Sequence, residues 1–194
     1  MRRLIHIPII HTAADLGSLS DPVKARYEQV LGPDGWSRRE RAIERFWDAI
    51  GQQVRRLRLE EKHARVYQDG LPVCGFEEKI VRELARAGSP NHQLIVELLD
   101  KGAELTGTED PRLLIEEYEF QKQAIPMASL SNPQRRERRD RADRLLKARD
   151  EFIAGRIDET LADGETGLLF LGALHRLDAL GPTGIRVVGL EEAS

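Results

Sequence analysis

Four ionisable side chains follow directly after short apolar runs of the sequence: His11, Asp69, Glu109 and His175. Apolar runs of this kind are typical of strands buried inside a parallel sheet. Because the carboxyl ends of parallel strands meet at one edge of the sheet, we expect these side chains to converge there. Imidazoles and carboxylates suit a divalent transition metal, for which His11, Asp69 and His175 are the predicted ligands. The same set equally suits metal-free acid–base catalysis, in which a carboxylate holds a histidine in one tautomer.

Each of these residues also has a purely structural interpretation. Asp69 precedes a glycine, a pair that tight turns select. Glu109 stands just before the start of an expected helix and could complement its dipole as part of an N-cap. His11 could simply bond a loop carbonyl. His175 follows small residues that permit close backbone approach, and it is the strongest candidate for a functional role.

The pattern of strands alternating with helices predicts how these residues are positioned. It indicates an α/β fold with a small, mostly parallel sheet of about five strands, covered by helices on both faces and joined by long helical connections. The expected strands lie at about 4–10, 64–67, 103–106, 167–172 and 185–188. The expected helices lie at about 20–31, from Ser37 as far as Leu57, at 76–87 and 90–101, from Pro111 onward, and at 134–161. Residues 32–35 are expected to form a turn, and His63 and His92 to lie on helical surfaces. Residues 1–190 are predicted to form one domain, and residues 191–194 a frayed tail.

The composition is that of a globular domain with a heavily charged surface. Of 194 residues, 40% are hydrophobic and 32% charged, and the formal net charge is −3. The single cysteine, Cys74, excludes an internal disulfide. The apolar run at the N-terminus is too short for a signal peptide and is interrupted by His6 and Pro8. No apolar stretch approaches the roughly 20 residues that would cross a bilayer. We therefore predict a cytoplasmic protein with no membrane partner.

The expected helix at 134–161 carries most of the basic charge. Its run 135–141 could contact phosphates, but acids are interleaved with the arginines and aromatic residues are absent, so nucleic acid is not the expected partner. Arg149 could stabilise negative charge that develops during a reaction. Alternatively, it could belong to a solvated helix face with local ion pairs. Trp36 and Trp47 could be core residues or the interface of a homo-oligomer.

The C-terminal part of the chain holds three motifs in a fixed order. Arg149-Asp150 lies on a helix, Gly172-Ala173-Leu174-His175 ends a strand, and a glycine leads the last strand at 184–188. This ordered set resembles the closing motifs of the TraB/Tiki superfamily, which also takes in the erythromycin esterases and the haem-binding ChaN-like proteins. The resemblance implies a hydrolase-like site, with metal-dependent peptide cleavage proposed for the Tiki branch and metal-free ester hydrolysis for the esterase branch. The family's early histidine and the acidic residue after its second strand would correspond to His11 and Asp69.

Two hypotheses follow from the sequence. The first is a hydrolase-like domain acting on a small ester or a peptide, with His11 and His175 as metal ligands or general base and Asp69 and Glu109 as ligand or orienting carboxylates. In this hypothesis Arg149 stabilises developing charge. The second is a non-catalytic module on the same fold that binds a ligand or a partner protein. An enzyme requires His11, His175 and a carboxylate to converge within hydrogen-bond or metal-ligand reach, whereas a binding module does not.

Overall fold

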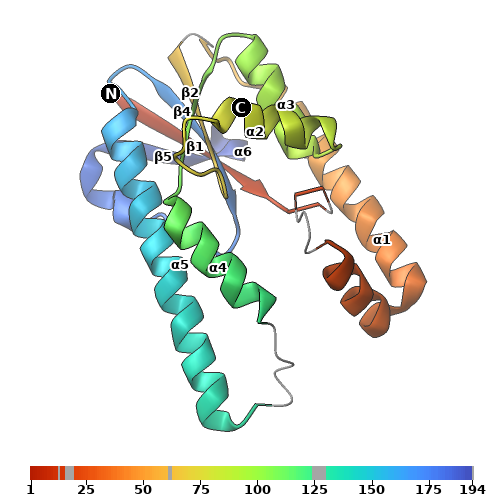
Figure 1. Cartoon of the computed structure of the whole chain (residues 1–194). Coiled ribbons are helices and arrows are strands. Elements are labelled where there is room, and N and C mark those ends of the chain that lie inside the picture. Colours follow the sequence, from red (N-terminus) through yellow and green to blue (C-terminus); the bar gives the residue numbers. More distant parts are fainter. Residues whose placement is uncertain (13, 16–19, 61–62, 124–129, 194) are drawn as a thin grey trace.

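Five short strands form one sheet in the order β3-β2-β4-β1-β5, and every neighbouring pair runs parallel. In chain order they are β1 (Arg2–Ile9), β2 (Ala64–Gln68), β3 (Glu104–Thr106), β4 (Thr166–Gly172) and β5 (Ile185–Gly189). Figure 1 shows this computed structural model, which describes all residues except 13, 16–19, 61–62, 124–129 and 194. The predicted parallel α/β class is confirmed.

Helices cover both faces of the sheet. They are α1 (Ser20–Arg56), α2 (Glu77–Arg86), α3 (Pro90–Asp100), α4 (Pro111–Lys122), α5 (Asn132–Thr160), the 3-10 helix η4 (Asp178–Thr183) and α6 (Leu190–Ala193). Helices α1, α2, α3 and α6 contribute to one core with Ile7, Val66 and Phe170 of the sheet. Helices α5 and η4 contribute to a second core on the opposite face, with Tyr67 and Leu169.

The position of β4 in the sheet explains why apolar and polar residues do not alternate along this strand. Leu168 and Phe170 belong to the first core, whereas Leu169 and Leu171 belong to the second. All four side chains are almost completely buried. A central parallel strand with helices on both faces needs apolar residues at every position, which is the pattern that predicted this strand.

The structure bears on three sequence-based expectations. The expected break between two helices is present, because α1 consists of two helices joined across a kink at Gly32 (φ 71°, ψ 170°), a backbone conformation that favours glycine; the expected turn is shorter, since residues 33–35 are already helical. Of the expected frayed tail 191–194, residues 191–193 belong to the short helix α6, which Leu190 anchors in the first core, and residue 194 lies outside the described residues. Trp36 and Trp47 are both buried within the single chain.

The register brings the carboxyl ends of the three central strands together. Ile9 lies opposite Gly172 in the β1–β4 pair, and Gln68 lies opposite Phe170 in the β2–β4 pair. From β1 the chain leads to α1 on one face, and from the neighbouring β4 it leads to η4 on the other. Ligands of open parallel sheets bind where neighbouring strands lead in opposite directions. The loops that hold His11 and His175 begin at this point.

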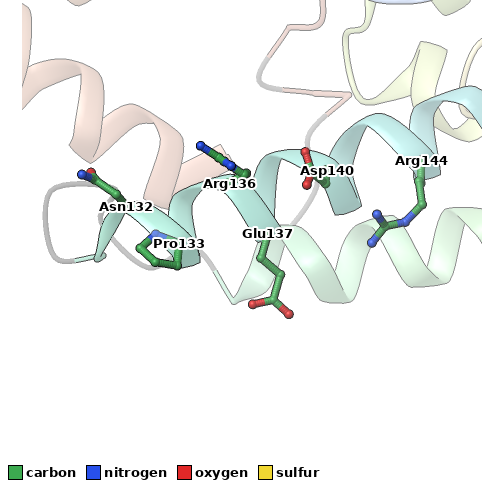
Figure 2. Close-up of a pocket in the computed structure, with 6 residues that line it drawn as sticks. All are labelled: Asn132, Pro133, Arg136, Glu137, Asp140 and Arg144. Carbon is green, nitrogen blue, oxygen red and sulfur yellow. The ribbon is translucent and has the colours of Figure 1, made fainter.

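Helices α4 and α5 lie side by side and extend beyond the sheet (Figure 1). A pocket on the first half of α5 is lined by Asn132, Pro133, Arg136, Glu137, Asp140 and Arg144. Figure 2 shows that the side chains of Arg136 and Glu137 leave the helix in opposite directions. The two arginines of this lining are balanced by two acids, so the pocket does not have the excess positive charge of a phosphate-binding surface. Among the described helices, none is long and apolar enough to cross a membrane.

Candidate functional site

The guanidinium of Arg149 binds three carboxylates at the carboxyl edge of the sheet. Nε and Nη2 donate to the two oxygens of Glu109, each at 2.6 Å. Nη2 also donates to Oδ1 of Asp69 at 2.9 Å, and Nη1 donates to Oε2 of Glu117. These four residues are called the Arg149 cage below. The arrangement contradicts the interpretation of Arg149 as part of a solvated helix face, because this side chain is only 7% exposed.

Backbone donors from the strand ends hold the acids of the cage in place. The amide N–H of Gly70 donates to Oε1 of Glu109 at 2.8 Å. The amide N–H of Gly172 donates to Oδ2 of Asp69 at 3.0 Å. A Cβ atom at Gly172 would lie only 2.9 Å from that same Oδ2 atom, so the close approach of β4 to Asp69 requires glycine. The short distance to Asp69 therefore explains why β4 ends in glycine.

His175 lies between two carboxylates. Its Nδ1 atom is 2.6 Å from Oδ1 of Asp150, and its Nε2 atom is 3.4 Å from Oδ1 of Asp69. The second oxygen of Asp150 accepts the amide N–H of Arg176 at 3.1 Å, which fixes the loop after β4 to α5. With an acceptor at each ring nitrogen, this arrangement favours the doubly protonated, positively charged imidazole.

His11 approaches the other oxygen of Asp69. Its Nε2 atom lies 3.8 Å from Oδ2 of Asp69, and its side chain is 47% exposed. Asp69 thus stands between the two imidazoles, one of which is buried and the other open to solvent. The structure brings all four residues singled out by position, His11, Asp69, Glu109 and His175, to the same edge of the sheet.

The charges of the site explain the directions in which its groups titrate. Burial alone would raise the pKa of Asp69, but His175 and Arg149 lower it far below the ordinary value. Burial alone would lower the pKa of His175, yet its contacts with Asp69 and Asp150 raise it. Burial raises the pKa of Glu109, and the contact with Arg149 opposes this without reversing it. The negative charge of the three carboxylates around Arg149, and of Asp150 beside His175, is therefore offset in part by the imidazole of His175.

The cage also bears on the predicted metal. Asp69, Glu109 and His175 each offer one ligand atom, and these atoms all lie within 4.8 Å of one another. However, both oxygens of Glu109 and Oδ1 of Asp69 already accept hydrogen bonds from Arg149. A metal ion held by this set would compete with the guanidinium for the same oxygens, so the donor set does not fit a resident metal while Arg149 occupies it.

Sequence reasoning gave no role in the site to Glu117 and His92, and it placed Asp150 only in the Arg149-Asp150 motif, without its contact to His175. Glu117 on α4 joins the cage, and Asp150 binds His175. His92 is buried at the start of α3, so its expected place on a helix surface is wrong. The signal for His92 was the Ser89-Pro90 pair, a helix N-cap that draws the following residues into contact with the strand ends.

Comparison with known proteins adds no relative. No protein-family model, no curated protein and no solved structure matches the chain.

Proposed function

We propose that this chain is a metal-independent hydrolase that cleaves a small ester or a peptide at the carboxyl edge of its sheet. One observation carries the proposal: Asp69 lies between a solvent-exposed histidine, His11, and a buried one, His175. An exposed imidazole oriented by a carboxylate is the usual arrangement of a general base. The resemblance of the C-terminal motifs to the TraB/Tiki superfamily supports the same reaction class.

In the proposed reaction His11 is the catalytic base. Its Nε2 atom faces Asp69 at 3.8 Å; once this contact tightens to a hydrogen bond, the carboxylate holds the proton on Nε2, and Nδ1 accepts a proton from a water molecule. The water oxygen forms the new bond to the carbonyl carbon, and the bond to the leaving alkoxide or amine breaks. The proton held on His11 then passes to the leaving group, so that an ester and water give an acid and an alcohol.

The buried residues act by positioning. Asp69 fixes the orientation of His11, and Arg149 and His175 keep Asp69 ionised through direct contacts. Glu109 and Glu117 hold the guanidinium in turn. The N–H groups of Arg149 that reach the cage all donate to carboxylates. We therefore assign Arg149 the role of holding Asp69 in place, instead of stabilising the negative charge that develops on the substrate.

The experiment is a hydrolysis assay on 4-nitrophenyl esters of increasing acyl length and on a mixed peptide library. We expect turnover by the wild type to persist in the presence of a chelator. His11→Gln should lower kcat/KM by about 100- to 10,000-fold, the range for loss of a general base. The matched control is His63→Gln, at a histidine whose side chain is 66% exposed and forms an ion pair with Glu60, away from the proposed site.

Two outcomes would overturn the proposal. Loss of turnover with a chelator, together with about one transition-metal ion per chain by plasma mass spectrometry, would transfer the role to a metal site. Wild-type protein that hydrolyses none of these compounds would leave the non-catalytic binding module as the remaining hypothesis.

A further inference from the structure

The loop after β1 is fastened to the start of α3 by one buried acid. Asp15 Oδ2 accepts hydrogen bonds from the amide N–H of Thr12 at 2.6 Å and from its hydroxyl at 2.8 Å. Asp15 Oδ1 lies 3.2 Å from Nδ1 of His92, and the two side chains are only 5% and 7% exposed. We call the group Thr12, Asp15, Ser89 and His92 the Asp15 clasp. It joins the residue directly after His11 to a different element of the fold.

The clasp contains a serine, a histidine and an aspartate, but its geometry is not that of a nucleophilic triad. Ser89 Oγ lies 2.7 Å from Nδ1 of His92, the same ring nitrogen that faces Asp15. A triad needs the nucleophile and the carboxylate on different nitrogens of the imidazole. Ser89 is also completely buried and caps α3 by accepting the amide N–H of His92. The clasp is therefore suited to holding the loop, and it is not suited to attacking a substrate.

A second anchor holds the chain on the other side of His11. The indole Nε1–H of Trp47 donates to the carbonyl oxygen of Ile10 at 3.1 Å. His11 is half-exposed, and both of its neighbours in sequence are hydrogen-bonded. The carbonyl of Ile10 accepts from α1, and the amide of Thr12 donates to the clasp. Neither anchor touches the imidazole, but together they fix the backbone that presents it to Asp69.

From this arrangement we infer that Asp15 is a positioning residue for His11, which it holds through Thr12 against the carboxylate of Asp69. The inference rests on the proposed function for its catalytic consequence. The clasp itself is a property of the fold and can be measured without any substrate. Burial alone would raise the pKa of Asp15, but the nearby His92 and Ser89 and the hydrogen bonds from Thr12 lower it to about 2, so this carboxylate is ionised at neutral pH.

The test compares Asp15→Asn with Asp21→Asn, a matched variant at an exposed acid of α1. In Asp15→Asn we expect kcat for ester hydrolysis to fall about 10- to 100-fold with little change in KM, because a misplaced base slows the chemical step. The same substitution in a His11→Gln background should have no further effect on kcat, since a positioning residue acts only through the group it positions. Thr12→Ser, which keeps the hydroxyl donor, should retain kcat, whereas Thr12→Val should lower it. A purely structural role would change stability without this dependence on His11.

Amide hydrogen exchange measured by NMR separates the possible failures. We expect the Thr12 amide to exchange faster in Asp15→Asn than in the wild type, because it loses a charged acceptor. An unchanged exchange rate in a folded Asp15→Asn variant would overturn the clasp itself. If the wild type hydrolyses the ester and Asp15→Asn has the same kcat, the inference is overturned and the proposed function still stands. Should Asp15→Asn fail to fold, Thr12→Val gives the same comparisons with a smaller change.

Discussion

Arg149 offers the sharpest test of the site, because removing it would leave the buried carboxylate of Glu109 without a counter-charge and take one of the two closest cations from Asp69. In Arg149→Met the aliphatic stem is largely preserved, while Glu109 and Asp69, with side chains 0% and 5% exposed, lose the donors that lie 2.6 to 2.9 Å away. Breaking a buried ion pair on one side typically costs about 3–5 kcal/mol, and we expect this loss in the free energy of unfolding at pH 7. For a domain of this size the corresponding fall in Tm is roughly 6–20 °C.

The size of the effect should depend on pH in a defined direction. In the wild type the pKa of Asp69 is lowered, so its contribution to stability is present above the ordinary value of 3.8 and is lost only as the pH falls below it. In Arg149→Met the buried carboxylate of Glu109 loses its cation, and burial then raises its folded pKa further above that of the unfolded chain, whereas Asp69 keeps His175 as a neighbour. The variant therefore regains stability as Glu109 takes up a proton, and the gap to the wild type should narrow between pH 7 and pH 5.

Urea unfolding followed by circular dichroism at pH 7.5, 6.0 and 5.0 measures this gap. The matched control is Arg144→Met on the same helix, an exposed arginine, for which we expect a change of no more than about 0.5 kcal/mol. The double variant Arg149→Met/Glu109→Gln should recover part of the loss, since it removes one of the unpaired charges. A loss below about 1 kcal/mol at pH 7.5, or a loss that does not change with pH, would refute the reasoning.

Three further results are expected from the same structure. Gly172→Ala would place its Cβ 2.9 Å from Oδ2 of Asp69 and should cost about 1–3 kcal/mol in urea unfolding. Gly155→Ala, where a Cβ meets no atom within 4 Å, should not destabilise, and equal effects at the two glycines would contradict this account. The pKa of His175 is raised, so its contribution to stability is complete below the ordinary value of 6.5 and is lost as the pH rises through the pKa of the folded protein. An NMR titration that finds His175 neutral at pH 6 would show that its contacts with Asp69 and Asp150 are not formed. Leu168→Ala, in the centre of β4, should cost about 2–5 kcal/mol in the same unfolding assay, whereas Leu174→Ala, at a side chain 80% exposed, should change stability little.

The fold could be predicted well from local sequence, because its elements obey local rules. The run 167–172 is apolar at every inner position, and only a strand between two helical layers has that pattern. Ser89-Pro90 and Asp110-Pro111 both mark helix starts, and α3 and α4 begin at these prolines. Once the strands are placed, His11, Asp69, Glu109 and His175 follow, because a parallel sheet gathers its carboxyl ends at one edge.

What could not be predicted is the pairing of charges between distant segments. Arg149 meets Glu109 and Asp69 across 40 and 80 positions of sequence; its spacing with Leu145 and Ile153 places it on the buried face of α5, but nothing local names its partners. His92 has a visible N-cap before it, but its burial depends on Asp15, which arrives from the loop after β1. Such contacts depend on how helices are placed over the sheet; periodicity indicates which face of a helix is buried, as on α5, but not which residues of other elements it meets.

The strand order also has a consequence for the synthesis of the chain. Among the described strands, β1 pairs with β4 and β5, which are translated after the other strands of this sheet. At about 5–20 residues per second, the stretch between Ile9 and Thr166 takes the ribosome roughly 8–30 s to translate, and through this interval β1 has no strand to pair with. Ile5, Ile7 and Ile9, all buried in the finished fold, then remain open to other nascent chains and to chaperones. During synthesis, β1 is therefore protected from aggregation only after β4 and β5 have been made and have paired with it.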